Sequence, residues 1–359
     1  MSTIYDVARV AGVSPKTVSR VLNGDAPVGK KTREAVEAAM AELGFVRSSA
    51  ARMMRASKSG LIGLITGAIS HSPEPSEPAG LPDLFIVQGI QRAIAAEGKT
   101  LMIADTGGHS DKVAHLMHTF LEHRVEGLIY VADYHQEVSL PPVGRDTPLV
   151  LANCFDAAGT PAVVPDDRRG QRELVTRLIA AGHSRIGYLT LQRNMVATGL
   201  RLAGYRDALE AAGIAPDPAL VVTGYLEGQG HDSRLLWDAI DRLLSMPEPP
   251  TVLCCGNDEM AMRAYGILRT RGLRVPEEIG VAGYDNYRVI AETLYPPLTT
   301  VELPYVAIGM RAAETLLSLI NGEGPMQTNP TLVAGPVSWR SSVTATSNVR
   351  KLETKGRTT

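Results

Sequence analysis

The sequence predicts a protein of two parts: a small all-α head at the N-terminus and a larger α/β body made of two similar lobes. Two observations lead to this fold class. Residues 1–60 contain ten Lys and Arg against five Asp and Glu, a net charge of +5, whereas the remaining residues carry a net charge of −7. From residue 61 onwards, short apolar runs alternate with helical patterns, and about eight such units exceed what one sheet comfortably holds. A basic head on an acidic body suggests that the head binds a polyanion.

The composition is that of a globular chain with two or three domains. Of the 359 residues, 21% are charged and 44% are hydrophobic, and no apolar run approaches the ~18–20 residues that span a bilayer. The N-terminus has no basic patch followed by an apolar stretch, so it does not read as a secretion signal. The cysteines are Cys154, Cys254 and Cys255, an odd number with two adjacent, which fits neither a disulfide framework nor a zinc site. We therefore expect a reduced, cytoplasmic protein.

We expect the head to span residues 1–46 and to begin with two short helices. Thr3 and Asp6 have the spacing of a capping box at the start of the first helix, which ends at Gly12. The second helix begins after Ser14, a strong N-cap followed by proline at the first helical position, and continues for about nine residues.

A third helix is expected from about Thr32 to Gly44, so the head has the pattern of a helix-turn-helix. The second helix of such a unit lies in the DNA major groove. Lys16 and Arg20 lie on the side opposite the apolar residues, and Arg20 suits a bidentate contact with guanine O6 and N7. The alternative is a small helical cap on an enzyme, in which these residues are merely solvated.

Several segments of the head form a dense pattern: Ile4-Tyr5-Asp6-Val7-Ala8, Ala11-Gly12-Val13-Ser14, Thr17-Val18-Ser19-Arg20-Val21-Leu22-Asn23, Thr32-Arg33-Glu34 and Glu42-Leu43-Gly44-Phe45. This pattern closely resembles the signature of the lactose-repressor (LacI/GalR) family of bacterial transcription regulators. In that family the residues matching Pro15, Lys16 and Arg20 face the bases. The DNA-binding residues predicted in the head are Thr3, Ser14, Pro15, Lys16, Thr17, Arg20, Asn23 and Lys30.

The resemblance also implies a hinge helix and linker in the segment 47–60. In the dimers of that family, two hinge helices enter the minor groove and a leucine wedges open the central base step. Met54 stands at the position of that leucine, and an apolar wedge is a known way to kink DNA. The family's usual proline at the start of the hinge is Arg47 here. The DNA-binding residues predicted in the hinge are Ala51, Arg52 and Met54.

We expect residues 61–340 to form the body. Its predicted strands are 61–66, 100–105, 126–131, 149–153, 186–190, 220–223, 251–254 and 279–284, and its helices are 87–97, 112–124, 169–181, 199–212, 231–245, 259–271 and 305–321. This alternation favours parallel sheets with right-handed crossovers, whose ligands bind at the carboxyl ends of the strands. The expected boundaries are 61–159 and 287–320 for lobe 1, 160–286 and 321–340 for lobe 2, and 341–359 for a flexible tail.

Landmarks of the same family continue along the body: Ala181-Gly182-His183, Arg201-Leu202-Ala203-Gly204-Tyr205, Gly256-Asn257-Asp258, Gly283-Tyr284-Asp285-Asn286 and Pro297-Leu298-Thr299-Thr300-Val301. The resemblance implies two Rossmann-like lobes, similar to periplasmic sugar-binding proteins, which dimerise and bind an effector between them. The effector-binding residues implied by the matching positions are Phe85, Asn153, Arg201, Leu226, Asn257, Asp258 and Asp285. Asp166 is a weaker candidate.

Amides, carboxylates and an arginine together supply the donors and acceptors that hydroxyl groups need, which suits a sugar or a sugar derivative. Arg201 also suits a carboxylate or a phosphate. In the alternative, purely structural interpretation, Asp285 belongs to a strand-end turn and Asn257 caps a helix. The Pro- and Ser-rich segment 70–82 borders the expected cleft, as a lid or simply as a mobile loop.

The sequence therefore predicts an effector-controlled transcription regulator, usually a repressor, that binds a near-palindromic operator as a homodimer. We expect it in the cytoplasm, on the nucleoid when bound to its operator. The alternatives are a cytoplasmic sugar-binding protein or a metabolic enzyme, in each case without a DNA function. No GxSxG motif is present, and His115 and His118 have metal-like spacing without a completing Cys or carboxylate, so we expect no enzyme, cofactor or metal site.

Overall fold

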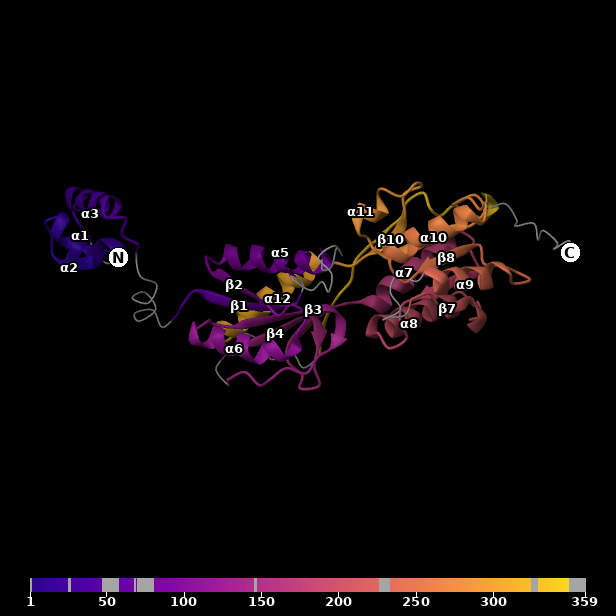
Figure 1. Ribbon diagram of the computed structural model, residues 1–359, viewed down its shortest axis with the longest axis horizontal. Coiled ribbons are helices and arrows are strands. Elements are labelled where there is room, and N and C mark those ends of the chain that lie inside the picture. Colours follow the sequence, from indigo (N-terminus) through magenta and orange to yellow (C-terminus); the bar gives the residue numbers. More distant parts are fainter. Residues whose placement is uncertain are drawn as a thin grey trace. The chain divides into compact units, whose positions relative to one another are not determined.

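The computed structural model describes residues 2–24, 27–46, 58–67, 69, 81–144, 147–225, 233–323 and 329–348. It divides into a head, residues 1–59, and a body, residues 60–359 (Figure 1). The predicted residues Ala51, Arg52, Met54 and Leu226, and most of the segment 70–82, lie outside the described residues. None of the described helices is both long enough and apolar enough to cross a membrane.

The head contains the three predicted helices, α1 (Ile4–Val10), α2 (Pro15–Asn23) and α3 (Lys30–Glu42). Thr3 and Asp6 form the predicted capping box, and Ser14 accepts a hydrogen bond from the backbone of Thr17. One fully buried valine from each helix makes the centre of a small core: Val7, Val18 and Val36. Helix α3 begins at Lys30, two residues before the expected start near Thr32.

Lobe 1 of the body is a parallel sheet in the order β11-β5-β4-β3-β1-β2, with helices on both faces. The strands are β1 (Leu61–Thr66), β2 (Thr100–Asp105), β3 (Leu128–Glu137), β4 (Leu149–Phe155), β5 (Ala162–Pro165) and β11 (Thr331–Val333), and the helices are α5 (Leu81–Ala96), α6 (Val113–Glu122), α12 (Tyr305–Ile320) and the short η1 (Ser110–Lys112). Alternate residues of β1 face opposite sides, so Ile62 and Leu64 pack under α5 and α12 while Ile65 packs under α6.

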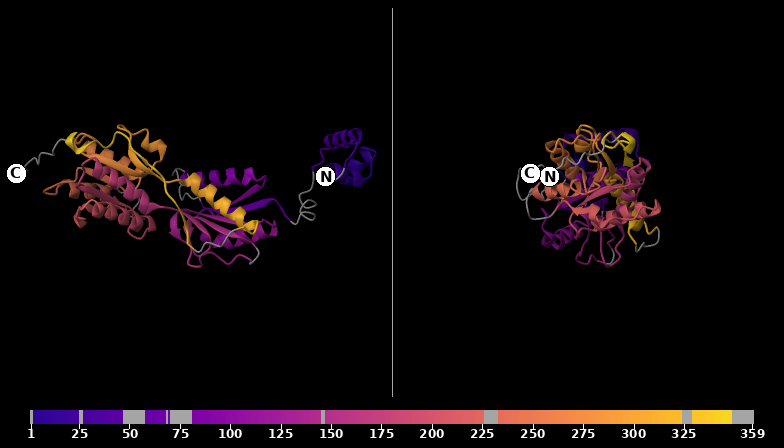
Figure 2. Two further views of the ribbon diagram at one scale, coloured as in Figure 1. Left: turned by 180° about the vertical axis from the view of Figure 1, so that it is seen from behind. Right: turned by 90° about the vertical axis from the view of Figure 1, so that its right-hand side faces the viewer.

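Helices α5 and α12 are more than 200 positions apart in the sequence but lie side by side on lobe 1 (Figure 2). Glycine makes this approach possible, because a Cβ at Gly309 would lie 2.1 Å from the backbone oxygen of Ile86, and one at Gly89 would lie 2.2 Å from that of Val306. The return of α12 to lobe 1 therefore depends on two residues without side chains.

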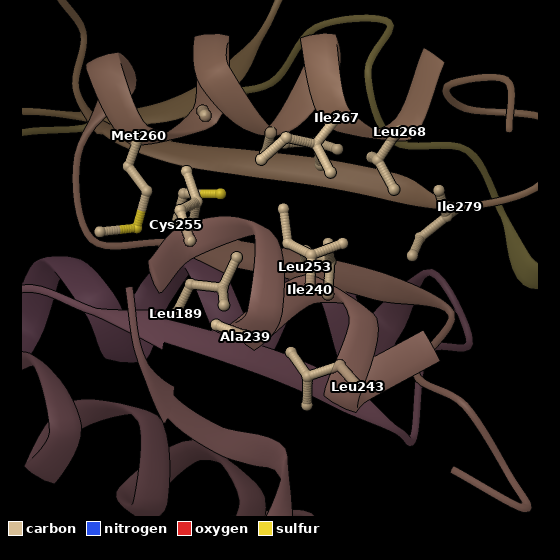
Figure 3. Packing of buried hydrophobic residues seen from close by; sticks show 14 of the residues in the cluster. Leu189, Ala239, Ile240, Leu243, Leu253, Cys255, Met260, Ile267, Leu268 and Ile279 are labelled. Carbon is tan, nitrogen blue, oxygen red and sulfur yellow. The ribbon is translucent and has the colours of Figure 1, made fainter. Parts of the chain in front are cut away.

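Lobe 2 is a second sheet in the order β12-β10-β9-β8-β6-β7, parallel except for β12. The strands are β6 (Ile186–Thr190), β7 (Val221–Thr223), β8 (Val252–Cys255), β9 (Gly280–Asp285), β10 (Thr299–Glu302) and β12 (Val337–Ser338), and the helices are α7 (Asp167–Ala180), α8 (Val196–Ala211), α9 (Ser233–Leu244), α10 (Asp258–Thr270), α11 (Arg288–Ala291), η2 (Pro218–Leu220) and η3 (Thr346–Asn348). Helices α7 and α8 cover one face. On the other face, Leu189, Leu253 and Cys255 of the strands meet apolar residues of α9 and α10 (Figure 3).

The described chain passes between the lobes after β5, after β10 and after β11, which corrects the predicted lobe boundaries. Residues 162–165 belong to lobe 1, because β5 pairs with β4. Residues 287–303 belong to lobe 2, because β10 pairs with β9, whereas 331–333 return to lobe 1 beside β5. These short strands are not recognisable from local sequence, and only their pairing assigns them to a sheet.

The start of the predicted tail is ordered, which is a second correction. Ser342 is fully buried, its hydroxyl donates to the carbonyl of Val281 at 2.6 Å, and the same oxygen accepts from the backbone of Thr299 at 2.7 Å. His183, in the predicted Gly-His pair, meets the carbonyl of Thr344 at 2.9 Å. Residues 341–348 are therefore part of lobe 2, and 349–359 lie outside the described residues.

Candidate functional site: a helix-turn-helix surface and an arginine cleft

The candidate DNA surface is the outer face of α2. Pro15, Lys16 and Arg20 are all exposed, as predicted, because the buried face of α2 is taken up by valines of the head core. Glycine at position 24 ends the helix in the left-handed conformation, with φ of 70°. The three residues therefore stand free on a short, firmly capped helix, which is the arrangement that major-groove contact requires.

The other predicted head residues have local structural partners. Thr3 and Ser14 cap α1 and α2, and the hydroxyls of Ser14 and Thr17 lie 2.9 Å apart. The amide of Asn23 donates to the hydroxyl of Ser19 at 3.3 Å, and Lys30 lies 3.9 Å from Glu34. Their contacts with DNA stay predictions.

Tyr5 is a head residue that the sequence interpretation missed as a candidate. Its side chain is 72% exposed although it lies in α1 between core positions. The available signal was its helical phase, since Ile4, Val7 and Ala8 take the buried face and turn residue 5 outward.

The centre of the body's candidate site is Arg201, which α8 of lobe 2 carries almost wholly buried, at 4% exposure. Its Nε donates to Oδ1 of Asp167 at 2.7 Å, and its Nη1 donates to the carbonyl of Gly256 at 2.6 Å. The guanidinium lies over the ring of Tyr284, 3.6 Å from the ring centroid. A cation paired with a carboxylate and stacked on an aromatic ring is held in one orientation.

Asp167 is the first residue of α7 and is fully buried. Its Oδ2 lies 2.8 Å from Nδ1 of His135, which belongs to β3 of lobe 1. Burial alone raises the pKa of Asp167, but the charge of Arg201 and the hydrogen bond with His135 outweigh it and hold the pKa below its usual value. Asp167 is therefore an ionised carboxylate that joins groups from both lobes.

Asp258 and Asp285 of lobe 2 lie near enough to Arg201 for its charge to act on both carboxyl groups, and their contacts with an effector stay predictions. Both oxygens of Asp258 are already occupied, because the hydroxyl of Thr300 donates to one at 2.6 Å and the backbone of Tyr287 to the other at 2.8 Å. Burial raises the pKa of Asp258 to about 7. Burial likewise raises the pKa of Asp285 well above its usual value, against the attraction of Arg201.

The two predicted amides lie at the carboxyl ends of β4 and β8. The amide of Asn153 donates to the carbonyl of Ala132 at 3.1 Å, inside lobe 1. Asn257 is the N-cap of α10 and accepts from the backbone of Met260 at 2.8 Å, so it does cap a helix, and its contact with an effector stays a prediction. Asn153 and Asp285 both have positive φ, 61° and 120°, and strained non-glycine residues of this kind cluster at binding sites.

A cavity of about 520 Å³ brings together the predicted residues Phe85 of lobe 1 and Asp285 of lobe 2. Tyr305 and Met310 of α12 also line it, and the sequence interpretation singled out neither. Arg201, Asn153, Asn257 and Asp258 do not line this cavity, so only part of the predicted set meets there. Among the described residues, no cluster of three His, Cys, Asp or Glu could hold a metal ion.

His135, Asp167 and Tyr284 are the site residues that sequence reasoning missed. It weighed the neighbouring Asp166, which instead caps α7 at the surface through the backbone of Arg169. An Asp-Asp pair after the apolar run 162–165 was the available signal, but that run was not recognised as a strand.

Two known families match parts of the chain: bacterial regulatory proteins of the lacI family over residues 3–48, and the periplasmic binding protein-like domain over residues 175–343. The chain is 32% identical over 323 residues to the HTH-type transcriptional repressor PurR of Vibrio atlanticus (strain LGP32), covering 89% of this chain and 92% of that protein. It is 33% identical over 335 residues to the ribose operon repressor of Escherichia coli (strain K12), covering 92% and 95%.

Among solved structures, the lac repressor dimer bound to operator and the anti-inducer ONPF is similar, with a TM-score of 0.72 and 28% identity over 96% of this chain and 99% of that one. Three observations point to the same family: the helix-turn-helix head, the two-lobed α/β body, and the similarity to these repressors along nearly the whole chain. The chain belongs to the lacI family of bacterial regulatory proteins and is a DNA-binding transcriptional regulator.

Proposed function

We propose that this regulator is a homodimeric repressor that binds a near-palindromic operator and is controlled by a neutral, hydroxyl-rich effector held between its lobes. Two features of the chain together carry the proposal. Helix α2 exposes the basic residues Lys16 and Arg20. In the body, Arg201, the only buried arginine among the described residues, is already neutralised by Asp167. We place the protein in the cytoplasm, on the nucleoid when bound to its operator.

The charge of the cleft supports a neutral effector. Arg201 is paired with the ionised Asp167, so a carboxylate or phosphate of a ligand would have to displace that partner or share the arginine with it. Burial raises the pKa of Asp285, which lines the cavity, well above its usual value, so its protonated carboxyl group can donate as well as accept hydrogen bonds. Sugar hydroxyls instead both donate and accept hydrogen bonds, so they suit the carboxyl group of Asp285 in the cavity without displacing any charge. The names of the ribose operon repressor and of a related regulator solved with cellobiose agree with a sugar.

Exposed apolar side chains support self-association. Tyr295 is 94% exposed and Val289 is 65% exposed, both in the segment that follows β9 in lobe 2, and Ile103 on the edge strand β2 of lobe 1 is 45% exposed. Large apolar groups in water mark protein–protein contact sites when they gather. A two-fold dimer would present two α2 helices to successive major grooves about one helical turn apart.

The experiment has a DNA arm and a ligand arm. Selection from a random duplex library with the full chain should yield a near-palindromic consensus; no enrichment over bulk DNA would favour the alternative, a sugar-binding protein without a DNA function. Thermal unfolding should then be followed with neutral sugars such as D-ribose and cellobiose, with sugar acids and sugar phosphates, and with nucleobases.

A bound ligand at a hundred times its Kd stabilises by about 2.7 kcal/mol. We expect a neutral sugar to raise the Tm and Asp285→Ala to remove that shift, with Asp238→Ala, an exposed aspartate on α9, as the matched control. A shift produced only by sugar acids, sugar phosphates or nucleobases would overturn the assignment of a neutral, hydroxyl-rich effector.

A further inference from the structure

The chain of groups His135–Asp167–Arg201 passes from one lobe to the other through buried atoms. His135 is 6% exposed, Asp167 is fully buried and Arg201 is 4% exposed. The two contacts measure 2.8 Å and 2.7 Å and use different oxygens of Asp167. The carboxylate is therefore shared between a residue of lobe 1 and the arginine of the cleft.

The direction of the hydrogen bonds follows from the charge of Asp167. An ionised carboxylate has only acceptor sites, so Nδ1 of His135 must carry the hydrogen that it shares with Oδ2. No solvent reaches the buried carboxylate to replace a lost donor without a change in the surrounding structure. A buried acceptor left without its donor is costly, so the pairing favours the lobe arrangement that preserves it.

Within lobe 1, three features position His135. The register between β3 and β4 shifts between Val131 and Gln136, so the strand leaves regular pairing where His135 lies. The amide of Asn153 holds this irregular stretch through the carbonyl of Ala132. The ring of Phe155, at the end of β4, meets the imidazole edge-on, with centroids 5.8 Å apart.

Asp167 and Arg201, at the other end of the chain of groups, both belong to lobe 2. A Cβ at Gly204 of α8 would lie 2.1 Å from the carbonyl of Arg168, so α7 and α8 pack in close contact. Arg168 and Asp207 add a two-pronged ion pair between these helices, at 2.6 Å and 2.8 Å. Asp167 and Arg201 therefore move as one body, and both hydrogen bonds of Arg201 end within lobe 2.

We propose that His135 and Asp167 are positioning residues that couple the arrangement of the two lobes to the guanidinium of Arg201. His135 holds one oxygen of Asp167 from lobe 1, and the other oxygen orients the arginine in lobe 2. A shift of His135 with lobe 1 then changes the orientation of Arg201, and a change at Arg201 alters the contact with His135. This inference rests on the proposed function, because it identifies the contacts that connect an occupied cleft with lobe 1. Lobe 1 follows the DNA-binding head in the sequence.

The test measures the distance between the lobes in the full chain, without DNA or effector. Spin labels on Lys112→Cys in lobe 1 and Arg269→Cys in lobe 2 report that distance, since both positions are exposed while the natural cysteines are buried. We expect His135→Leu, which removes the donor, to shift or broaden the distance distribution. His135→Asn, which places an amide donor near the position of Nδ1, should restore it.

Arg201→Gln tests whether a change confined to lobe 2 alters the distance between the lobes, because it removes only contacts inside lobe 2. We expect it to shift the same distance, and we expect the double variant with His135→Leu to shift no further than the larger single change. Tyr205→Phe is the matched control, since it removes a buried hydrogen bond to the carbonyl of Ile186 that lies within lobe 2, and it should leave the distribution unchanged.

If His135→Leu does not fold, His135→Gln replaces it, since its amide nitrogen reaches the position of Nε2 and not of Nδ1; the same shift is expected. An unchanged distribution in the folded His135 variant, or in Arg201→Gln, would overturn the proposal, as would an equal shift in Tyr205→Phe. Operator selection decides the proposed function separately, so the two failures are distinguishable.

Discussion

At the scale of single residues, Asp258 illustrates how burial changes chemistry. The carboxyl group is enclosed in lobe 2, where the hydroxyl of Thr300 and the backbone of Tyr287 contact its two oxygens. Burial raises its pKa from the usual 3.8 to about 7, although both hydrogen bonds favour the charged form. The loss of hydration therefore outweighs two donors, and the group titrates close to neutral pH.

The pKa of Asp258 predicts a pH dependence of stability. The folded protein binds the proton of Asp258 more tightly than the unfolded chain does. The stabilisation that this proton gives the folded state is therefore fully present below about pH 4 and is lost as the pH rises through about 7. One such proton changes the free energy of unfolding by up to about 1.4 kcal/mol per pH unit. Urea unfolding of Asp258→Asn between pH 4 and 8 should give a flatter profile than the parent, while Asp238→Asn keeps the parent slope. An unchanged slope in Asp258→Asn would assign the titration to another group.

Arg20 carries the prediction for base recognition. Its exposed guanidinium suits a bidentate contact with guanine, which contributes ~1–3 kcal/mol of discrimination. Arg20→Ala should therefore relax the preference at one base pair in each half-site, as measured by titration against operators with single substitutions. Arg33→Ala removes the same charge from α3 and should weaken all sequences alike. The assignment of α2 to the groove would be wrong if Arg20→Ala left the base preferences intact.

At the scale of elements, close packing of helices through glycine decides which lobe a helix joins. Helix α12 follows β10 of lobe 2 but lies on lobe 1 against α5, where Gly89 and Gly309 let the two backbones touch. In lobe 2, Gly204 plays the same part between α7 and α8. Neither pair of helices is adjacent in the sequence, since β6 lies between α7 and α8, and each close contact depends on a glycine without a Cβ.

We predict that Gly309→Ala destabilises the body by about 1–3 kcal/mol, because the added Cβ would overlap the backbone of α5 and force the helices apart. Gly266→Ala in α10 is the matched control, since a Cβ added there would meet no atom within 4 Å, and it should stabilise by about 0.5–1 kcal/mol. Denaturant unfolding of both variants measures the difference. Equal effects of the two substitutions would exclude close helix packing as the cause.

At the scale of the whole molecule, the proposed function requires coupling between the effector cleft in the body and the DNA-binding head. The described chain enters the body at Gly60, whose backbone donates to Glu126 at 2.6 Å, and Lys99 holds the other oxygen of that carboxylate at 2.6 Å. This anchor fixes where the segment 47–60 meets β1. A coupling of ~1–3 kcal/mol between two sites is typical of such regulators, and it requires an effector that contacts two lobe arrangements differently.

Met54 carries the prediction at this scale, although it lies outside the described residues. If it wedges into the minor groove, Met54→Ala should weaken operator binding much more than binding to bulk DNA, because only the specific complex is kinked. Titration of both DNAs at one salt concentration, together with the bend angle of the operator, measures this. The same bend angle in parent and variant would count against the wedge, and Met53→Ala is the neighbouring control.

The head and the alternating pattern of the body could be predicted from sequence because their signals are local. A capping box joins Thr3 to Asp6, and Ser14 caps a helix that starts at the next residue, so a few positions contain the whole interaction. The long helices of the body follow for the same reason, since their apolar faces repeat within one element. The exposed face of α2, with Lys16 and Arg20, is a consequence of this local pattern.

The tertiary structure alone decided how distant segments combine. Strands β5, β10, β11 and β12 have two to four residues each, and it is their hydrogen-bonded neighbours that assign them to a lobe. The same holds for the site: Asp166 and Asp167 are indistinguishable in sequence, yet one caps α7 at the surface while the other is buried between His135 and Arg201. Burial and ion pairing depend on partners 32 and 34 positions away, and the free energy of such contacts is defined only once the chain has brought them together.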